Sequence, residues 1–143
     1  NQKKDIEAIE RHGEEPQLIL CKNNHDEINK IKSLIDQFKQ SEFNSLGIIC
    51  KTQKQADYLN EALKTEHDIN LLNAGSVAFG RGIVITTAHL AKGLEFDKVI
   101  VAFCTLKNYK TEPDKQMLYV ACTRAMHKLF LTYTGNISSL IAS

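Results

Sequence analysis

This sequence has neither a long apolar run nor an excess of charge of one sign. No segment approaches the roughly 18 uninterrupted apolar residues that a membrane-spanning helix requires, so no membrane partner is expected. The 18 Lys and Arg residues nearly match the 17 Asp and Glu residues, and the net charge is only +1. This balance excludes a globally basic surface for nucleic acid, and any contact with phosphate is expected to be local.

Closely spaced cysteines are missing as well. The four are Cys21, Cys50, Cys104 and Cys122, and no two of them form a C-x-x-C pair. This spacing favours reduced thiols in a core over a zinc site or a disulfide framework, and no metal site is predicted. Reduced thiols are typical of the cytoplasm, which is the expected location of the protein.

Nucleotide-binding loops and a signal peptide are the remaining absences. There is no G-x-x-x-x-G-K-[ST] motif, and Gly75, Gly80 and Gly82 lack the G-x-G-x-x-G order, so these glycines predict an ordinary turn. The chain is therefore not expected to hold a triphosphate by itself. Residues 1–15 begin with Asn and contain no apolar segment of a signal peptide, which indicates a piece of a longer chain.

Short apolar segments alternate with helical patterns along the chain. Strands are expected at residues 17–21, 45–51, 69–74, 82–88, 98–104 and 128–134, and helices at residues 26–40, 55–64 and 113–126. Strands rich in Val and Ile that alternate with helices indicate a parallel sheet covered on both faces. We therefore predict a single domain over residues 1–143 with a doubly wound α/β fold.

A polar segment, HLAKGLEFD at residues 89–97, lies between two expected core strands. It follows the strand at 82–88, and ligands of a doubly wound sheet gather at the carboxyl ends of its strands. One interpretation is that Lys92 and Gly93 end a short helical turn and that Glu95 and Asp97 are solvated loop charges. The other is a binding site, because a lysine can meet phosphate and a carboxylate can accept a hydrogen bond from a ribose hydroxyl.

One arginine, Arg124, stands near the end of the helix expected at 113–126. A cation at a helix C-terminus stabilises the helix by about 0.3–1 kcal/mol, and this is the simpler interpretation. The functional alternative is an arginine that reaches a phosphate held by a neighbouring domain. The motif by itself does not decide between the two.

Three blocks of the sequence together resemble a known family. ITTAHLAKGLEFDKVIV and MLYVACTRAMHKLFL, in this order, resemble motifs V and VI of the UvrD/Rep/PcrA-like superfamily 1 DNA helicases, and LGIICKTQKQADYLNEAL is similar to motif IV. The resemblance covers residues 45–134 and implies the second RecA-like domain, a three-layer, mostly parallel sheet with helices on both faces. It also implies that the accessory insertion between motifs IV and V is absent, as in the shorter HelD-like proteins.

For ATP, the resemblance implies roles for five residues. Arg124 matches the motif VI arginine, which reaches the γ-phosphate of ATP held with Mg²⁺ by the first RecA-like domain; that domain and its Walker motifs are not in this sequence. Glu95 matches the glutamate that accepts from the ribose, and Lys92 and Gly93 would lie near the phosphates. Lys51 stands where motif IV has an arginine, so the charge is kept but the planar fork that grips two phosphate oxygens is lost.

For nucleic acid, the resemblance implies a different pair of residues. His89 and Thr87 match the part of motif V that faces the backbone of single-stranded DNA. Phe96, Phe103 and Tyr119 are expected in the core and not as platforms for base stacking. The implied partners are single-stranded or duplex DNA and the first RecA-like domain of the same chain.

The implied function is that of the C-terminal motor domain of an ATP-dependent DNA helicase or translocase, with ATP and Mg²⁺ as cofactors. The isolated chain is expected to be inactive as an ATPase. The alternative is an ATP-gated interaction module of a HelD-like protein that binds RNA polymerase. A degenerate domain that has lost its chemistry is disfavoured, because Arg124 and Glu95 are both present.

Overall fold

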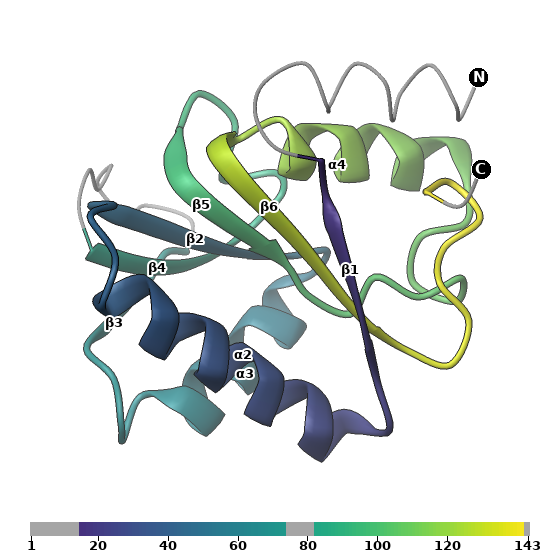
Figure 1. Ribbon diagram of the computed structural model, residues 1–143. Coiled ribbons are helices and arrows are strands. Elements are labelled where there is room, and N and C mark those ends of the chain that lie inside the picture. The colour runs from purple at the N-terminus through teal and green to yellow at the C-terminus, as the bar shows by residue number, and fades with distance from the viewer. Residues whose placement is uncertain (1–14, 74–81, 142–143) are drawn as a thin grey trace.

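The computed structural model describes residues 15–73 and 82–141 (Figure 1). In chain order its elements are β1 (Gln17–Cys21), α2 (Asn24–Lys39), β2 (Ser45–Cys50), α3 (Gln53–Leu63), β3 (Ile69–Leu71), β4 (Gly82–Thr87), β5 (Phe96–Val101), α4 (Glu112–Cys122) and β6 (Ala125–Thr134). Every strand and helix that the sequence predicted is therefore present. The expected turn at Gly75 and Gly80 lies outside the described residues. Within these ranges no helix is both long enough and apolar enough to span a membrane.

The strands form one sheet in the order β1-β6-β5-β2-β4-β3, and every neighbouring pair is parallel. Figure 1 shows α2 and α3 on one face of the sheet and α4 on the other. The predicted doubly wound α/β fold, with the three layers of a RecA-like domain, is confirmed. All residues of the central strand β2 are buried, as its continuous apolar run requires.

Each face of the sheet has its own hydrophobic core. The core under α2 and α3 includes Ile31, Ile35, Leu59 and Leu63. The core under α4 includes Ala88, Ala91, Phe96, Leu118 and Ala121. Because residues of the segment between β4 and β5 belong to this second core, that segment is packed against the sheet.

Cys50 lies in the first of these cores and Cys104 and Cys122 lie in the second, while Cys21 is buried at the end of β1. All are buried, and no disulfide joins them. Burial raises the pKa of the Cys122 thiol to about 12, because a low-dielectric core disfavours the thiolate. In the described ranges, the His, Cys, Asp and Glu side chains form no group of three or more that could hold a metal ion.

The boundary between the last helix and the last strand differs from the expectation. A helix was predicted over 113–126, but α4 ends at Cys122 and β6 already starts at Ala125. The N–H group of Phe96 donates to the carbonyl of Arg124 (2.9 Å), and Phe96 pairs with Ala125 across the sheet. Pairing with β5 therefore ends the helix earlier than the sequence pattern suggested.

The aromatic residues expected in the core are divided by the structure. Phe96 and Phe103 are buried, whereas Tyr119 is 39% exposed, so the expectation for Tyr119 is wrong. The reason is helical geometry: α4 buries Leu118, and the next residue along a helix points about 100° away.

Candidate functional site

The segment between β4 and β5 carries most of the predicted site residues. It leaves the carboxyl end of β4 at Thr87 and reaches the amino end of β5 at Phe96. The buried Thr87 hydroxyl accepts a hydrogen bond from the N–H group of Leu90 (3.2 Å), and the Thr87 carbonyl accepts one from Ala91 (2.9 Å). This turn holds His89 in an exposed position at the carboxyl edge of the sheet.

The second half of the segment is exposed at Lys92, Gly93 and Glu95. Gly93 has a φ of 83°, in the left-handed region that side chains other than glycine rarely adopt. No atom lies within 4 Å of the position that a Cβ of Gly93 would take. The backbone conformation, and not close packing, therefore requires glycine here.

Arg124 lies beside the end of this segment. Its Nε donates to the carbonyl of Val120 in the last turn of α4 (3.1 Å), and its Nη1 contacts the carbonyl of Leu94 (3.5 Å), the residue before Glu95. Among the described residues, no carboxylate lies within ion-pair distance of this guanidinium. The side chain thus stabilises the end of α4, as the simpler interpretation expected, while its charge remains available to an anion.

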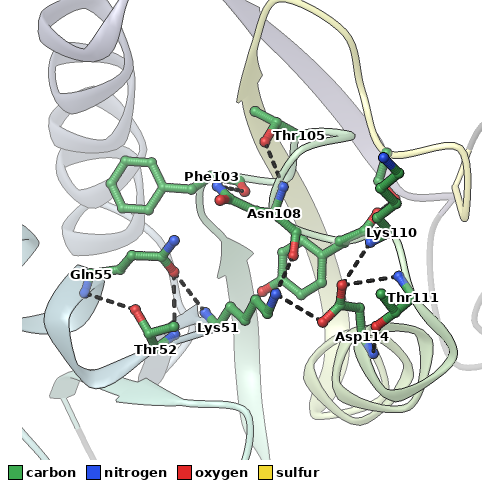
Figure 2. Close-up of polar contacts among 11 residues, drawn as sticks. Lys51, Thr52, Gln55, Phe103, Thr105, Asn108, Lys110, Thr111 and Asp114 are labelled. Carbon is green, nitrogen blue, oxygen red and sulfur yellow. Dashed lines mark hydrogen bonds and ion pairs between the residues drawn. The ribbon is translucent and has the colours of Figure 1, made fainter.

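Lys51 follows β2 at the carboxyl edge of the sheet, and its ammonium group has two partners within the chain (Figure 2). The Nζ atom lies 2.8 Å from Oδ1 of Asp114 and donates to the carbonyl of Asn108 (2.6 Å). Asn108 donates from Nδ2 to the carbonyl of Phe103 (2.9 Å), a residue with a positive φ of 57°. Lys51 therefore ties the end of β2 to the segment that leads from β5 to α4.

Asp114 is the other half of this connection. Its Oδ2 accepts from the N–H groups of Lys110 (2.9 Å) and Thr111 (3.0 Å), and it forms a capping box with Thr111 at the start of α4. Burial alone would raise the pKa of Asp114, but the Lys51 ammonium and these N–H groups outweigh burial and hold the pKa well below its usual range. The T-x-x-D spacing signals the cap, but no sequence pattern pairs Asp114 with Lys51.

Five of the predicted site residues fall into two groups at opposite edges of the sheet, while Lys92 and Gly93 lie in the segment that runs between these edges. Arg124 and Glu95 lie together at the amino ends of β6 and β5. Lys51, Thr87 and His89 lie at the carboxyl ends of β2 and β4. The structure therefore places the arginine beside the backbone of Leu94, next to the glutamate in sequence, and it does not bring Lys51 to this edge.

Comparison with solved structures and with protein families identifies the domain. The crystal structure of the C-terminal domain of a possible DNA helicase from Lactobacillus plantarum WCFS1 matches 99% of this chain and 88% of that chain, with a TM-score of 0.82 and 30% sequence identity. A model of the UvrD-like helicase C-terminal domain matches residues 82–132. The chain belongs to the UvrD-like helicase C-terminal domains. It is the C-terminal domain of a helicase-like protein.

Two further matches place this UvrD-like domain in a wider context. The RecBCD enzyme subunit RecB of Chlamydia trachomatis serovar D is 46% identical over 56 residues, which are 36% of this chain and 5% of that protein. The chain thus spans a small fraction of the length of this curated relative. The C-terminal domain of the DEAD-box protein Dbp5 covers 90% of this chain at a TM-score of 0.60 and 22% identity, and it shares the fold.

The buried carboxylate of Glu27 in this UvrD-like domain was not predicted from the sequence. Glu27 on α2 is fully buried; its Oε2 accepts from the N–H group of Phe103 (2.9 Å) and the hydroxyl of Thr132 (2.7 Å), and its Oε1 has no partner in the described part of the chain. Burial raises the pKa of Glu27, although both hydrogen bonds oppose the shift. A signal was present, since Glu27 stands four residues before Ile31 on the apolar side of the helix.

Proposed function

We propose that this chain is the second RecA-like motor domain of an ATP-dependent superfamily 1 DNA helicase or translocase. The observation that carries the proposal is Arg124, which lies beside the motif V segment at the amino edge of the sheet with no carboxylate partner among the described residues. In the whole protein a first RecA-like domain with Walker motifs would hold most of the nucleotide. The accessory insertion would be absent between motifs IV and V.

The residues at the amino edge fit a nucleotide in their chemistry. An uncompensated guanidinium suits a γ-phosphate, because it neutralises charge that develops in the transition state of phosphoryl transfer. The exposed Glu95 carboxylate can accept a hydrogen bond from a ribose hydroxyl, and Lys92 adds a cation beside the open space at Gly93. ATP with Mg²⁺ would supply the phosphoryl group that is transferred to water.

The carboxyl edge would carry the DNA track. His89 is exposed there, whereas Thr87 is buried and uses its hydroxyl to close the turn below His89. We assign the contact with the DNA strand to His89, and we assign to Thr87 the role of holding the turn in shape. The Lys51 ammonium uses two of its three donors on Asp114 and Asn108, so one donor remains for a nucleotide.

The test is ATP hydrolysis by the full-length helicase, with and without single-stranded DNA, for wild type and Arg124→Ala. We expect DNA to stimulate the wild type and Arg124→Ala to lose about 10³-fold or more in kcat, as for other arginines that reach a transferred phosphoryl group. ATP binding by the variant should persist. Arg124→Lys serves as the conservative control and should recover only part of the loss, since an ammonium lacks the planar fork.

Two results would contradict this function. Hydrolysis that is indifferent to DNA would favour the ATP-gated interaction module that binds RNA polymerase. Full activity of Arg124→Ala would show that the arginine serves only the end of α4. An unchanged melting temperature in the variant excludes unfolding as the cause of a lost activity.

A further inference from the structure

An open cavity of about 690 Å³ lies at the carboxyl ends of β1, β5 and β6, away from Arg124. It is lined by Asn24 and Glu27 from α2, by residues of the segment between β5 and α4, and by Thr134 and Asn136 after β6. None of these residues belongs to the motif V or motif VI site. The cavity therefore needs its own explanation.

The position of the cavity follows from the topology of the sheet. The chain leaves β1 toward α2 on one face, and it leaves β5 toward α4 on the other face (Figure 1). The two connections diverge around the end of β6, which lies between β1 and β5. In open α/β sheets such a switch point leaves a crevice outside the carboxyl ends of the strands, and ligands bind in it.

The rim of the cavity is basic. Lys107 and Lys110 line it, both residues are exposed, and no carboxylate of the described residues forms an ion pair with either ammonium. The exposed Asn24 and Asn136 add amide groups, which can donate hydrogen bonds to phosphate oxygens. This combination suits a phosphate.

One wall of the cavity is held in place before any ligand binds. Asn108 lines the cavity, donates to the carbonyl of Phe103 and accepts from Lys51, and the N–H group of Lys110 donates to Asp114 (Figure 2). The N–H group of Phe103 is held in turn by the buried Glu27. A wall fixed by these bonds loses little entropy when a ligand binds.

We propose that this cavity is a second contact for single-stranded DNA, in which Lys107 and Lys110 take a backbone phosphate. The cavity lies at the same edge of the sheet as His89, with the end of β2 between them. A single DNA strand that passes along this edge would therefore contact both. The proposal rests on the proposed function, which places the DNA track at this edge. It adds a basic contact that no helicase motif of the sequence contains.

The experiment measures the binding of a labelled oligothymidylate to this chain over a range of salt concentrations. We compare wild type, the double variant Lys107→Ala/Lys110→Ala, and the control Lys32→Ala/Lys64→Ala. The control removes the same charge from α2 and the C-cap of α3, where the two lysines pair with Glu66 and Glu61. Thermal melting confirms that each variant is folded.

We expect weak binding by the wild type that is lost as salt increases. In the double variant the slope of log K against log salt should shrink by about 0.7 for each phosphate contact removed, and the control should keep the wild-type slope. An equal slope in the double variant and the control overturns the cavity contact. If His89→Ala still weakens binding in that case, the DNA track of the proposed function stands.

Two other outcomes also overturn the proposal. In one, inorganic phosphate displaces the oligothymidylate at constant ionic strength, and the affinity does not differ between oligothymidylates of different length. This result would identify a site for free anions and not a contact with a DNA strand. A wild-type chain with no salt-dependent binding even at low salt would contradict both the cavity contact and the DNA track.

Discussion

At the scale of single residues, the contact between Lys51 and Asp114 gives the motif IV position a structural role. An arginine was expected at position 51 from the resemblance, and the lysine there places its compact ammonium between Oδ1 of Asp114 and the carbonyl of Asn108. Three donors on one small group suit two acceptors from different elements. The residue therefore joins β2 to α4 whether or not it also meets a nucleotide.

The first prediction at this scale concerns Asp114→Asn. The folded pKa of Asp114 is lowered, so its ionised form stabilises the fold above the unfolded pKa, and this contribution is lost as the pH falls through the folded value. We expect the variant to lose about 1.5–3 kcal/mol at neutral pH, the range for hydrogen bonds to charged groups. Its free energy of unfolding should also fall less steeply in acid.

Urea denaturation over a pH series measures both effects. Asp68→Asn is the matched control, because this aspartate is exposed and no described contact involves it. If Asp114→Asn and Asp68→Asn behave alike, the carboxylate of Asp114 contributes nothing that an amide cannot replace.

At the scale of elements, β2 and β5 fit together through one glycine. Gly47 lies in the central strand, and a Cβ at this position would come within 2.5 Å of the ring of Phe96 on β5. The ring occupies the space that a side chain on β2 would need. Glycine usually weakens a strand, so its presence here is explained by this close approach.

We predict that Gly47→Ala destabilises the domain by about 1–3 kcal/mol, the usual cost of overpacking a core. Chemical denaturation of wild type and variant measures the difference. The double variant Gly47→Ala/Phe96→Leu should be less destabilised than the sum of the two single variants, because the smaller side chain relieves the clash. Simple additivity would refute the steric explanation.

At the scale of the whole molecule, Glu27 joins parts of the chain that are distant in sequence. From α2 it accepts hydrogen bonds from Phe103, after β5, and from Thr132 on β6, which is 105 positions away. One buried carboxylate thus links α2 to β6 and to the segment that follows β5. Its Oε1 remains without a partner in the described residues.

We predict that Glu27→Gln changes how stability depends on pH. The pKa of Glu27 is raised in the folded state. The contribution of Glu27 to the free energy of unfolding is therefore fully present below the pKa of the unfolded state and is lost as the pH rises through the pKa of the folded state. An amide does not titrate, so the stability of Glu27→Gln should not decline over this pH range. The control Glu42→Gln, at an exposed position, should keep the decline in stability that the wild type shows. Identical pH profiles of all three proteins, measured by thermal melting, would disprove the role of burial.

The sequence by itself determined the fold class, the elements and the order of the motifs. Apolar segments with a period of 2 or 3.6 encode short-range structure, and they placed every strand and helix of the described residues. The motif V and VI blocks likewise pointed to the helicase C-terminal domain. These properties depend on neighbours along the chain, which a sequence displays directly.

Only the tertiary structure decided where the helix before Arg124 ends, which edge of the sheet each site residue occupies, and that Lys51 binds Asp114. The packing of β6 against β5 set the helix boundary. The parallel direction of the strands placed Lys51, after β2, and Arg124, before β6, at opposite edges of the sheet, and the strand order formed the cavity beside Lys107. The physical reason is that such contacts join residues distant in sequence, and their geometry follows from register and packing, which local patterns do not encode.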